Sequence, residues 1–344
     1  MESLLVYIAW IGIMCLITIN LGIVFTTVFI NQKDQFNRKV YQKAYQQIVL
    51  ILEESNEDQD QLIEKLNVFK TKPERKAIFQ ALVDHVQHPK MTINALEILE
   101  KLGFIDDLVK DASKRLSLRQ IQLFSQLRYN KAFPILINGT KSKNFETSYN
   151  SFYALSLLSL SQEELPIYVE ALLKTTIMRD RKIDMLNHLD IEVGKLLYFL
   201  EKYPADSEKI IWLLVLKNRL KEQYSLWANQ LLPYLEGSKE VKIAVIQALA
   251  ASGNKSFFLF FKELYQKETD WQVRAVLSKN LQLLNAPWEQ ELLIEMLHDE
   301  NWWVRHNAMT TLKERYPDSG NLKMVEFENI NRLSQEKMKG SAVK

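Results

Sequence analysis

The chain has one cysteine, Cys15, among 344 residues. A single thiol excludes an intramolecular disulfide framework and every multi-cysteine zinc or iron–sulfur site. Glycine and proline are also scarce: the nine glycines and eight prolines are each less than half of the usual share, about 7% and 5%. Turn-rich β-sandwiches and glycine-loop nucleotide folds are therefore disfavoured, and no convincing strand alternation is found. The composition predicts an all-α chain.

Catalytic motifs are missing as well. The sequence contains no P-loop, no GxGxxG, no GxSxG and no HExxH pattern. Its adjacent acidic pairs point in different directions on a helix, unlike the facing carboxylates of a hydrolase. We therefore expect no catalytic residue, no metal site and no cofactor.

Positive charge is not concentrated in any stretch. The 44 lysines and arginines are nearly balanced by 42 aspartates and glutamates. Nucleic-acid binding depends on a concentrated basic face that releases counterions from the phosphates. We therefore expect no nucleic acid among the partners.

One long segment carries no charge at all. Residues 3–32 lie between Glu2 and Lys33 and consist mostly of large apolar side chains. About 20 apolar residues cross the roughly 30 Å hydrocarbon core of a bilayer. A cleaved signal peptide would need a basic start and a shorter apolar core, and a buried helix of a soluble protein is the other alternative. We expect residues 1–32 to be a retained single transmembrane anchor.

The orientation of this anchor follows from the basic residues that flank it. Lys33, Arg38, Lys39 and Lys43 follow the segment, and only the terminal amine precedes it. Basic residues close to a span resist translocation. The chain is therefore expected in the cell membrane, with the N-terminus outside and the C-terminal part in the cytoplasm.

The remaining sequence divides into three parts. Apolar residues at three- and four-residue spacing predict that the helix continues past the anchor. Five acidic residues from Glu53 to Asp60 mark a linker. Residues 33–60 are therefore expected to be a juxtamembrane helix and an acidic linker. Helical patterns fill 61–316. Proline and glycine after Tyr316 break the last helix, and 317–344 are expected to form a cap helix, from about Leu322 to Lys337, and a mobile tail.

An internal repeat occupies the carboxyl half of the helical part. Val241, Val273 and Val304 stand 32 and 31 residues apart, and each is followed eight residues later by a leucine. A related copy begins at Met91. Gly103 stands twelve residues after Met91, as Gly253 stands twelve residues after Val241. Weaker copies are placed near four further positions: Leu118, Phe145, Met178 and Glu208. A period of this length predicts stacked pairs of antiparallel helices that share one elongated core, a superhelical α-solenoid.

The segments Asp270–Arg274 and Asp299–Ala308 resemble HEAT repeats, particularly the short bacterial kind seen in phycobilin-lyase-like proteins. The resemblance implies a HEAT/armadillo-like solenoid over 61–316. In that family an acidic residue in the turn bonds a basic residue six positions later on the second helix. This sequence shows the spacing three times, and the resemblance implies a structural ladder of these pairs: Glu236 with Lys242, Glu268 with Arg274, and Asp299 with Arg305.

The sharpest local feature is an aromatic cluster at the start of the last repeat. Trp302, Trp303 and His306 lie beside Arg305, and Trp271 occupies a related place one repeat earlier. Large aromatic rings near arginine are typical of binding hot spots, although a tryptophan that packs between repeats would look the same. These four aromatic residues are the candidate partner-binding residues.

We expect a membrane-anchored scaffold or adaptor that binds a membrane-associated partner protein at the inner face of the membrane. The resemblance to bacterial HEAT proteins implies an envelope-polysaccharide or glycosyltransferase system as the partner. The alternative is a lyase-like HEAT enzyme or a tetrapyrrole binder, which would require polar residues converging in a deep pocket.

Overall fold

The structure, a computed structural model, describes residues 2–54, 59–86, 95–219, 225–318 and three helical residue pairs between 323 and 331. The side chains of residues 2–25 are not part of this description. Every element in the described ranges is a helix, and no strand occurs in them. The all-α prediction is confirmed.

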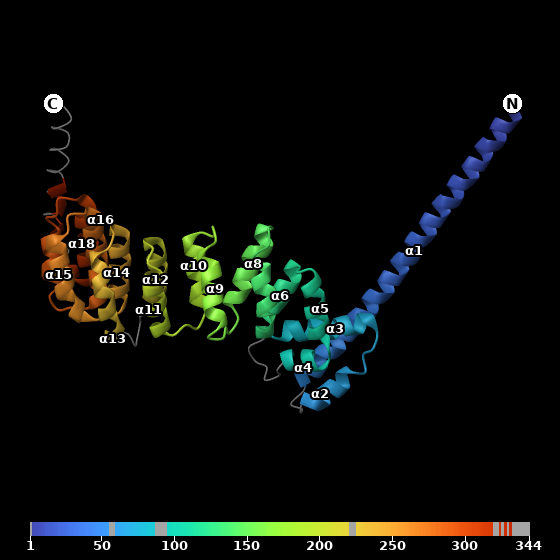
Figure 1. The fold of residues 1–344 in the computed structure, drawn as a ribbon, viewed down its shortest axis with the longest axis horizontal. Coiled ribbons are helices and arrows are strands. Elements are labelled where there is room, and N and C mark those ends of the chain that lie inside the picture. Colours follow the sequence, from blue (N-terminus) through green and yellow to red (C-terminus); the bar gives the residue numbers. More distant parts are fainter. Residues whose placement is uncertain are drawn as a thin grey trace. The chain divides into compact units, whose positions relative to one another are not determined.

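Helix α1 (Glu2–Glu54) is one uninterrupted helix of 53 residues (Figure 1). At a rise of 1.5 Å per residue it is about 80 Å long. Its carboxyl end packs on α3 (Lys72–Val86) and buries Ala44, Ile48 and Leu52, which follow one another at four-residue spacing. The prediction that the helix continues past the apolar segment is therefore confirmed.

None of the helices, as far as the structure describes their residues, combines the length and the apolarity that a membrane crossing needs. Most of the predicted span, 3–32, falls on residues whose side chains lie outside the description. The anchor stays a prediction from the sequence.

The structure divides the chain into two compact units, Met1–Leu160 and Ser161–Lys344. This boundary lies inside the region that the sequence predicted as a single solenoid, 61–316. In the first unit α3 packs against α4 and α6, and α8 packs against α6 and α7. Besides α1 and α3, this unit contains α2 (Gln59–Leu66), α4 (Ala95–Lys101), α5 (Phe104–Lys114), α6 (Leu118–Gln126), η1 (Asn130–Ala132), α7 (Phe133–Gly139) and α8 (Phe145–Ser156).

In the second unit, α10, α12, α14, α16 and α18 pack one against the next in chain order (Figure 1). A second helix packs on three of them, with α11 on α12, α15 on α16 and α17 on α18. The bounds are α9 (Glu164–Leu173), α10 (Arg179–His188), α11 (Val193–Lys202), α12 (Asp206–Arg219), α13 (Ser225–Ala228), η2 (Asn229–Glu236), α14 (Lys239–Ala251), η3 (Lys255–Phe257), α15 (Phe258–Lys267), α16 (Trp271–Asn280), η4 (Leu281–Leu284), α17 (Glu289–Met296) and α18 (Trp302–Arg315).

The repeat register read from the sequence matches the helices. Val241, Val273 and Val304 are the third residues of α14, α16 and α18. They are buried, and so are the leucines eight residues later: Leu249, Leu281 and Leu312. In α14 and α18 the leucine follows the valine by about two turns of the same helix, and Leu281 is the first residue of η4, directly after α16. The stacked core therefore uses the positions that the repeat predicted.

The weaker copies also coincide with helix starts. Copies near Leu118, Phe145, Met178 and Glu208 correspond to α6, α8, α10 and α12, which begin at or within two residues of these positions. The start of the copy at Met91 lies outside the described residues, and the described part of that copy begins with α4 at Ala95. The periodicity thus located helix starts even where the residues differ from those of the three clear copies.

The two glycines that marked equivalent places in the repeats, Gly103 and Gly253, share a left-handed backbone conformation. Their φ angles are 76° and 64°. Each follows a helix of the repeat closely, where a left-handed residue ends one helix and turns the chain towards the next. The shared spacing therefore reflects a shared backbone requirement.

We expect Gly253→Ala to lower the free energy of unfolding by about 1–2 kcal/mol, since an L side chain in the left-handed region costs about that much. A urea titration of the full chain in detergent micelles measures the effect. The matched control is Gly194→Ala: Gly194 lies within α11 at an ordinary φ with open space around it, so alanine there is neutral or stabilising. Equal destabilisation by both substitutions would contradict the prediction.

The carboxyl end follows the predicted break. Helix α18 ends at Arg315, and Tyr316 leaves the helical conformation with φ −131°. Most of the predicted cap helix and the tail lie outside the described residues. The described pairs 323–324, 327–328 and 330–331 are helical, and Asn331 contacts the last repeat, as described below.

Candidate functional site

An open groove of about 500 Å³ crosses the first turns of α14, α16 and α18. The three helices supply side chains from successive repeats. The lining residues are Lys239, Glu240, Ile243, Trp271, Gln272, Ala275, Val276, Trp303 and Asn307. Two of the four predicted binding residues, Trp271 and Trp303, thus lie in one groove.

The repeat register explains this lining. All nine side chains stand at the first, second, fifth or sixth position of their helix. These positions share one helix face near the amino end, because positions three and four apart are neighbours. Only the tryptophans were identified from the sequence; the others could have been found by projecting those four positions onto each repeat.

Side-chain caps hold the first turns that carry the tryptophans. Asp270 caps α16, and its Oδ1 accepts a hydrogen bond of 2.8 Å from the backbone N–H of Gln272. Asn301 caps α18 in the same way, with 2.9 Å between its Oδ1 and the backbone nitrogen of Trp303. Capping satisfies amide donors that have no partner inside the helix. Both tryptophans therefore extend from ordered turns.

The groove combines exposed aromatic rings with an aliphatic floor. Trp271 and Trp303 are 40% and 52% exposed. Ile243, Ala275 and Val276 supply apolar surface between them, and Lys239 and Glu240 add a charge of each sign. Lys239 Nζ also lies 3.9 Å from the carboxylate of Asp270. Such a surface suits a peptide or protein segment with apolar side chains and flanking polar groups.

The other two predicted binding residues, Trp302 and His306, stand beside the groove without lining it. Their rings stack, with centroids 4.6 Å apart and an interplanar angle of 14°. Trp302 also meets Trp303 edge to face at 4.7 Å. Aromatic contacts of this kind fix ring orientation. Trp302 and His306 therefore support the position of Trp303.

The structure brings the predicted ladder residues together, but Arg274 and Arg305 meet the backbone carbonyls of their predicted acidic partners and not the carboxylates. Arg305 Nη1 donates to the backbone carbonyls of Asp299 and Glu300, at 2.7 and 2.8 Å, instead of to the Asp299 carboxylate. Arg274 Nη1 makes the same two bonds to the carbonyls of Glu268 and Thr269. The six-residue spacing therefore reflects contact with the backbone of the turn.

The carboxylates of Glu268 and Asp299 bond basic side chains of the preceding repeat. Lys242 Nζ lies 2.9 Å from Glu268 Oε2, and Arg274 Nε lies 2.8 Å from Asp299 Oδ2. At the last repeat, Arg305 Nε donates to Asn331 Oδ1 over 2.9 Å. Arg274 and Arg305 thus each join their own turn to a residue 25 or 26 positions later, and Lys242 reaches Glu268, 26 positions later. The ladder runs between repeats and sets the register of the stack.

Glu236 does not belong to this ladder. By the same offset its basic partner would stand at Ile210 or Ile211, which are apolar and buried. Glu236 itself is exposed. The predicted pair of Glu236 with Lys242 is therefore replaced by the pair of Lys242 with Glu268.

Contacts within the ladder shift the pKa of three of its groups, Glu268, Arg274 and Arg305. Burial alone would raise the pKa of Glu268, but hydrogen bonds from the Asp270 amide and Lys242 outweigh it and lower that pKa. The hydrogen bonds to Asp299 raise the pKa of Arg274. Burial lowers the pKa of Arg305, partly opposed by the charge of Asp299. The two paired steps are therefore charge-assisted hydrogen bonds.

Across the described ranges no group of three or more histidine, cysteine, aspartate or glutamate side chains is arranged to hold a metal ion. The groove residues are instead suited to association through ring contact, apolar burial and hydrogen bonding. The expectations of no catalysis and no cofactor stay predictions.

No protein-family model matches the chain, and no curated protein matches its sequence.

Proposed function

We propose that the chain is a membrane-anchored docking protein whose HEAT-type solenoid binds a segment of a membrane-associated partner protein. The partner segment occupies the groove of α14, α16 and α18. The HEAT assignment is supported by the repeat spacing, by the buried valine and leucine positions and by the ladder that joins successive repeats.

The observation that carries the proposal is the pair formed by Trp271 and Trp303. These large side chains extend from two successive repeats into one groove while remaining about half exposed. A tryptophan used only for packing between repeats would be covered, as Trp212 is. Exposed tryptophans on an ordered surface are enriched where proteins bind one another.

The anchor rests on the sequence. Thirty residues without charge precede Lys33, and α1 continues from them into the packed helices of the first unit. With the N-terminus outside and the solenoid in the cytoplasm, the groove is confined to a thin layer at the inner membrane face. Confinement raises the effective concentration of a membrane-associated partner without any new contact.

Site-specific crosslinking in native membranes tests the docking groove. A photoreactive phenylalanine analogue replaces Trp303 in the full chain and, in a control, replaces Trp288. Trp288 is exposed at 54% and belongs to the same unit but does not line the groove. We expect one prominent protein adduct from position 303 that is absent from position 288 and is identified by mass spectrometry.

Substitution gives the matching loss of binding. Trp271→Ala should reduce the yield of the adduct at position 303 at least about tenfold, since removing a hot-spot tryptophan costs 2 kcal/mol or more of binding free energy. Trp288→Ala should leave the yield unchanged. No adduct at position 303, or the same adducts from both positions, would contradict the docking function.

A further inference from the structure

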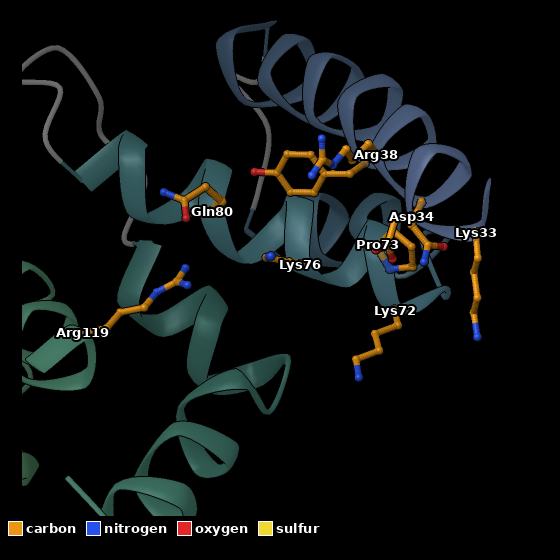
Figure 2. A pocket seen from close by; sticks show the side chains of 10 residues that line it. Lys33, Asp34, Arg38, Lys72, Pro73, Lys76, Gln80 and Arg119 are labelled. Atoms are coloured by element: carbon orange, nitrogen blue, oxygen red, sulfur yellow. The ribbon is translucent and has the colours of Figure 1, made fainter. Parts of the chain in front are cut away.

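A second groove, of about 660 Å³, lies in the first unit between α1, α3 and α6. Five basic residues contribute to its lining, with Lys33 and Arg38 from α1, Lys72 and Lys76 from α3, and Arg119 from α6. Figure 2 shows Arg119 pointing from α6 towards α3, and Lys33 and Lys72 extending away from their helices. Residues separated by up to 86 positions in the chain thus form one basic surface.

The basic groups have little local compensation. Asp34 is the one acidic residue in the lining, so the formal charge of the groove is +4, from five positive groups and one negative group. None of the five basic side chains forms an ion pair with another described residue. Elsewhere in the same unit, Lys101 and Lys131 do pair with carboxylates, at 2.9 Å each. Among the residues that the structure describes, the groove therefore concentrates positive charge that has no ion-pair partner.

Its position along α1 is as informative as its charge. Lys33 is the first residue after the charge-free segment, and Arg38 follows five residues later, about 7.5 Å further along a helix. The polar layer on each side of a bilayer is about 5–8 Å thick. If the segment spans the membrane, the basic residues of α1 lie at the depth of the lipid headgroups.

We infer that this groove binds the phosphate-bearing headgroup of an anionic membrane phospholipid. The inference rests on the anchor of the proposed function. Arginine and lysine bind phosphate oxygens through charge-assisted hydrogen bonds, and the amino-terminal turn of α3, which begins at Lys72, adds its partial positive charge. Tyr41 and Pro73 supply apolar surface in the same lining, against which the glycerol portion of the lipid packs.

The occupant favoured by this geometry is a lipid and not a nucleic acid. The groove is a local feature at the end of the predicted span, and the chain as a whole is nearly neutral, with a formal charge of +2. Nucleic-acid binding draws on an extended basic face that follows many phosphates. One or two phosphates held at a fixed depth need only a small cluster such as this one.

Native mass spectrometry of the full chain in detergent micelles tests the inference. Phosphatidylglycerol and phosphatidylcholine with the same acyl chains are added in increasing amounts. We expect the wild-type chain to retain phosphatidylglycerol at least about tenfold more tightly. A variant with Lys72→Gln, Lys76→Gln and Arg119→Gln should lose this preference, because each basic residue near an anionic lipid surface changes affinity several-fold.

The matched control removes the same number and kind of charges outside the groove, by Lys110→Gln, Lys114→Gln and Arg115→Gln. These three residues are exposed at the end of α5 and beyond it, and their loss should leave the preference for phosphatidylglycerol unchanged. Equal losses in both triple variants, or an unchanged preference in the groove variant, would overturn the inference.

Two further arms identify the source of the phosphate. Displacement of the lipid by inorganic phosphate at a similar concentration would assign the groove to a soluble phosphate compound and overturn the lipid proposal. An oligonucleotide that binds while phosphatidylglycerol does not would overturn it in favour of nucleic acid.

Failure of the groove and failure of the anchor are distinguishable. Lipid retention in micelles does not require a membrane-spanning segment, whereas alkaline carbonate extraction of native membranes reports on the anchor alone. Release of the wild-type chain by carbonate would contradict the anchor. Retention in the membrane together with an unchanged lipid preference in the groove variant would contradict the groove.

Discussion

Asp299→Ala is expected to lower the free energy of unfolding by about 3–5 kcal/mol, the usual cost of removing one partner from a buried ion pair. Asp299 and Arg274 have side chains that are 4% and 8% exposed, with 2.8 Å between Arg274 Nε and Asp299 Oδ2. The same carboxylate accepts hydrogen bonds from the Tyr265 hydroxyl at 3.2 Å and the Asn301 amide at 2.8 Å. The substitution leaves the guanidinium and both neutral donors without this acceptor.

A urea titration of the full chain in detergent micelles, followed by tryptophan fluorescence, measures the loss. Three of the seven tryptophans, Trp271, Trp302 and Trp303, lie in the affected helices, so part of the signal reports on the repeats that the ion pair joins. Stacked repeats can unfold in parts, and hydrogen exchange of α16 and α18 identifies where the loss occurs. We expect the exchange to increase in both helices.

Glu300→Ala is the control for this prediction. Glu300 also contacts Arg274, with 3.1 Å between its Oε1 and Arg274 Nη2, but its side chain is 84% exposed. An exposed partner contributes about 1 kcal/mol or less. Similar effects of Asp299→Ala and Glu300→Ala would show that burial of the pair does not determine its contribution.

The second large effect is expected from Arg315→Met, which should cost roughly 3–5 kcal/mol at neutral pH. Arg315 Nε lies 3.1 Å from Oε1 of Glu289, whose side chain is fully buried. The charge of Arg315 is the largest contribution that opposes this burial, followed by hydrogen bonds from the Tyr316 side chain and the Ala286 backbone. Arg315 also donates to Gln282 O and, over 2.7 Å, to Asn285 Oδ1.

The pH dependence of this variant distinguishes loss of charge compensation from loss of packing. Burial raises the pKa of Glu289, opposed by the positive charge of Arg315, so the variant should have a still higher pKa. The folded state then binds the proton more tightly than the unfolded state, whose glutamate pKa is about 4.3. The associated stability is present at low pH and is lost as the pH rises through the folded-state pKa.

The variant should therefore regain stability relative to wild type as the pH falls from 7 towards about 4.5, in urea titrations of the full chain. In the double variant Glu289→Gln with Arg315→Met the buried charge is gone, and the recovery should disappear. A pH-independent difference between Arg315→Met and wild type would contradict the assignment.

The six-residue spacing predicted which residues form the ladder but not which of their atoms meet. Glu268, Arg274, Asp299 and Arg305 were identified by a six-residue interval, and all four lie in one hydrogen-bonded array. Arg274 and Arg305 do contact their predicted residues, Glu268 and Asp299, but through the backbone carbonyls, because an interval along the chain does not tell whether a guanidinium meets the carboxylate or the carbonyl of the same residue. That choice depends on where the next repeat places its turn.

By itself the sequence determined the all-helical class, the helix starts of the repeats, the equivalent places of Gly103 and Gly253 and the continuation of α1. These are local properties: apolar periodicity and backbone requirements act within one or two turns of a helix. Tertiary structure alone decided the two grooves, the partners in the ladder and the boundary at Leu160. Lys33, Lys72 and Arg119 are scattered in a chain with balanced charge, and they form a basic surface only because α1, α3 and α6 surround one groove. Side chains from distant segments converge according to which helices pack together and at which register, and this is set by the contacts of the whole core.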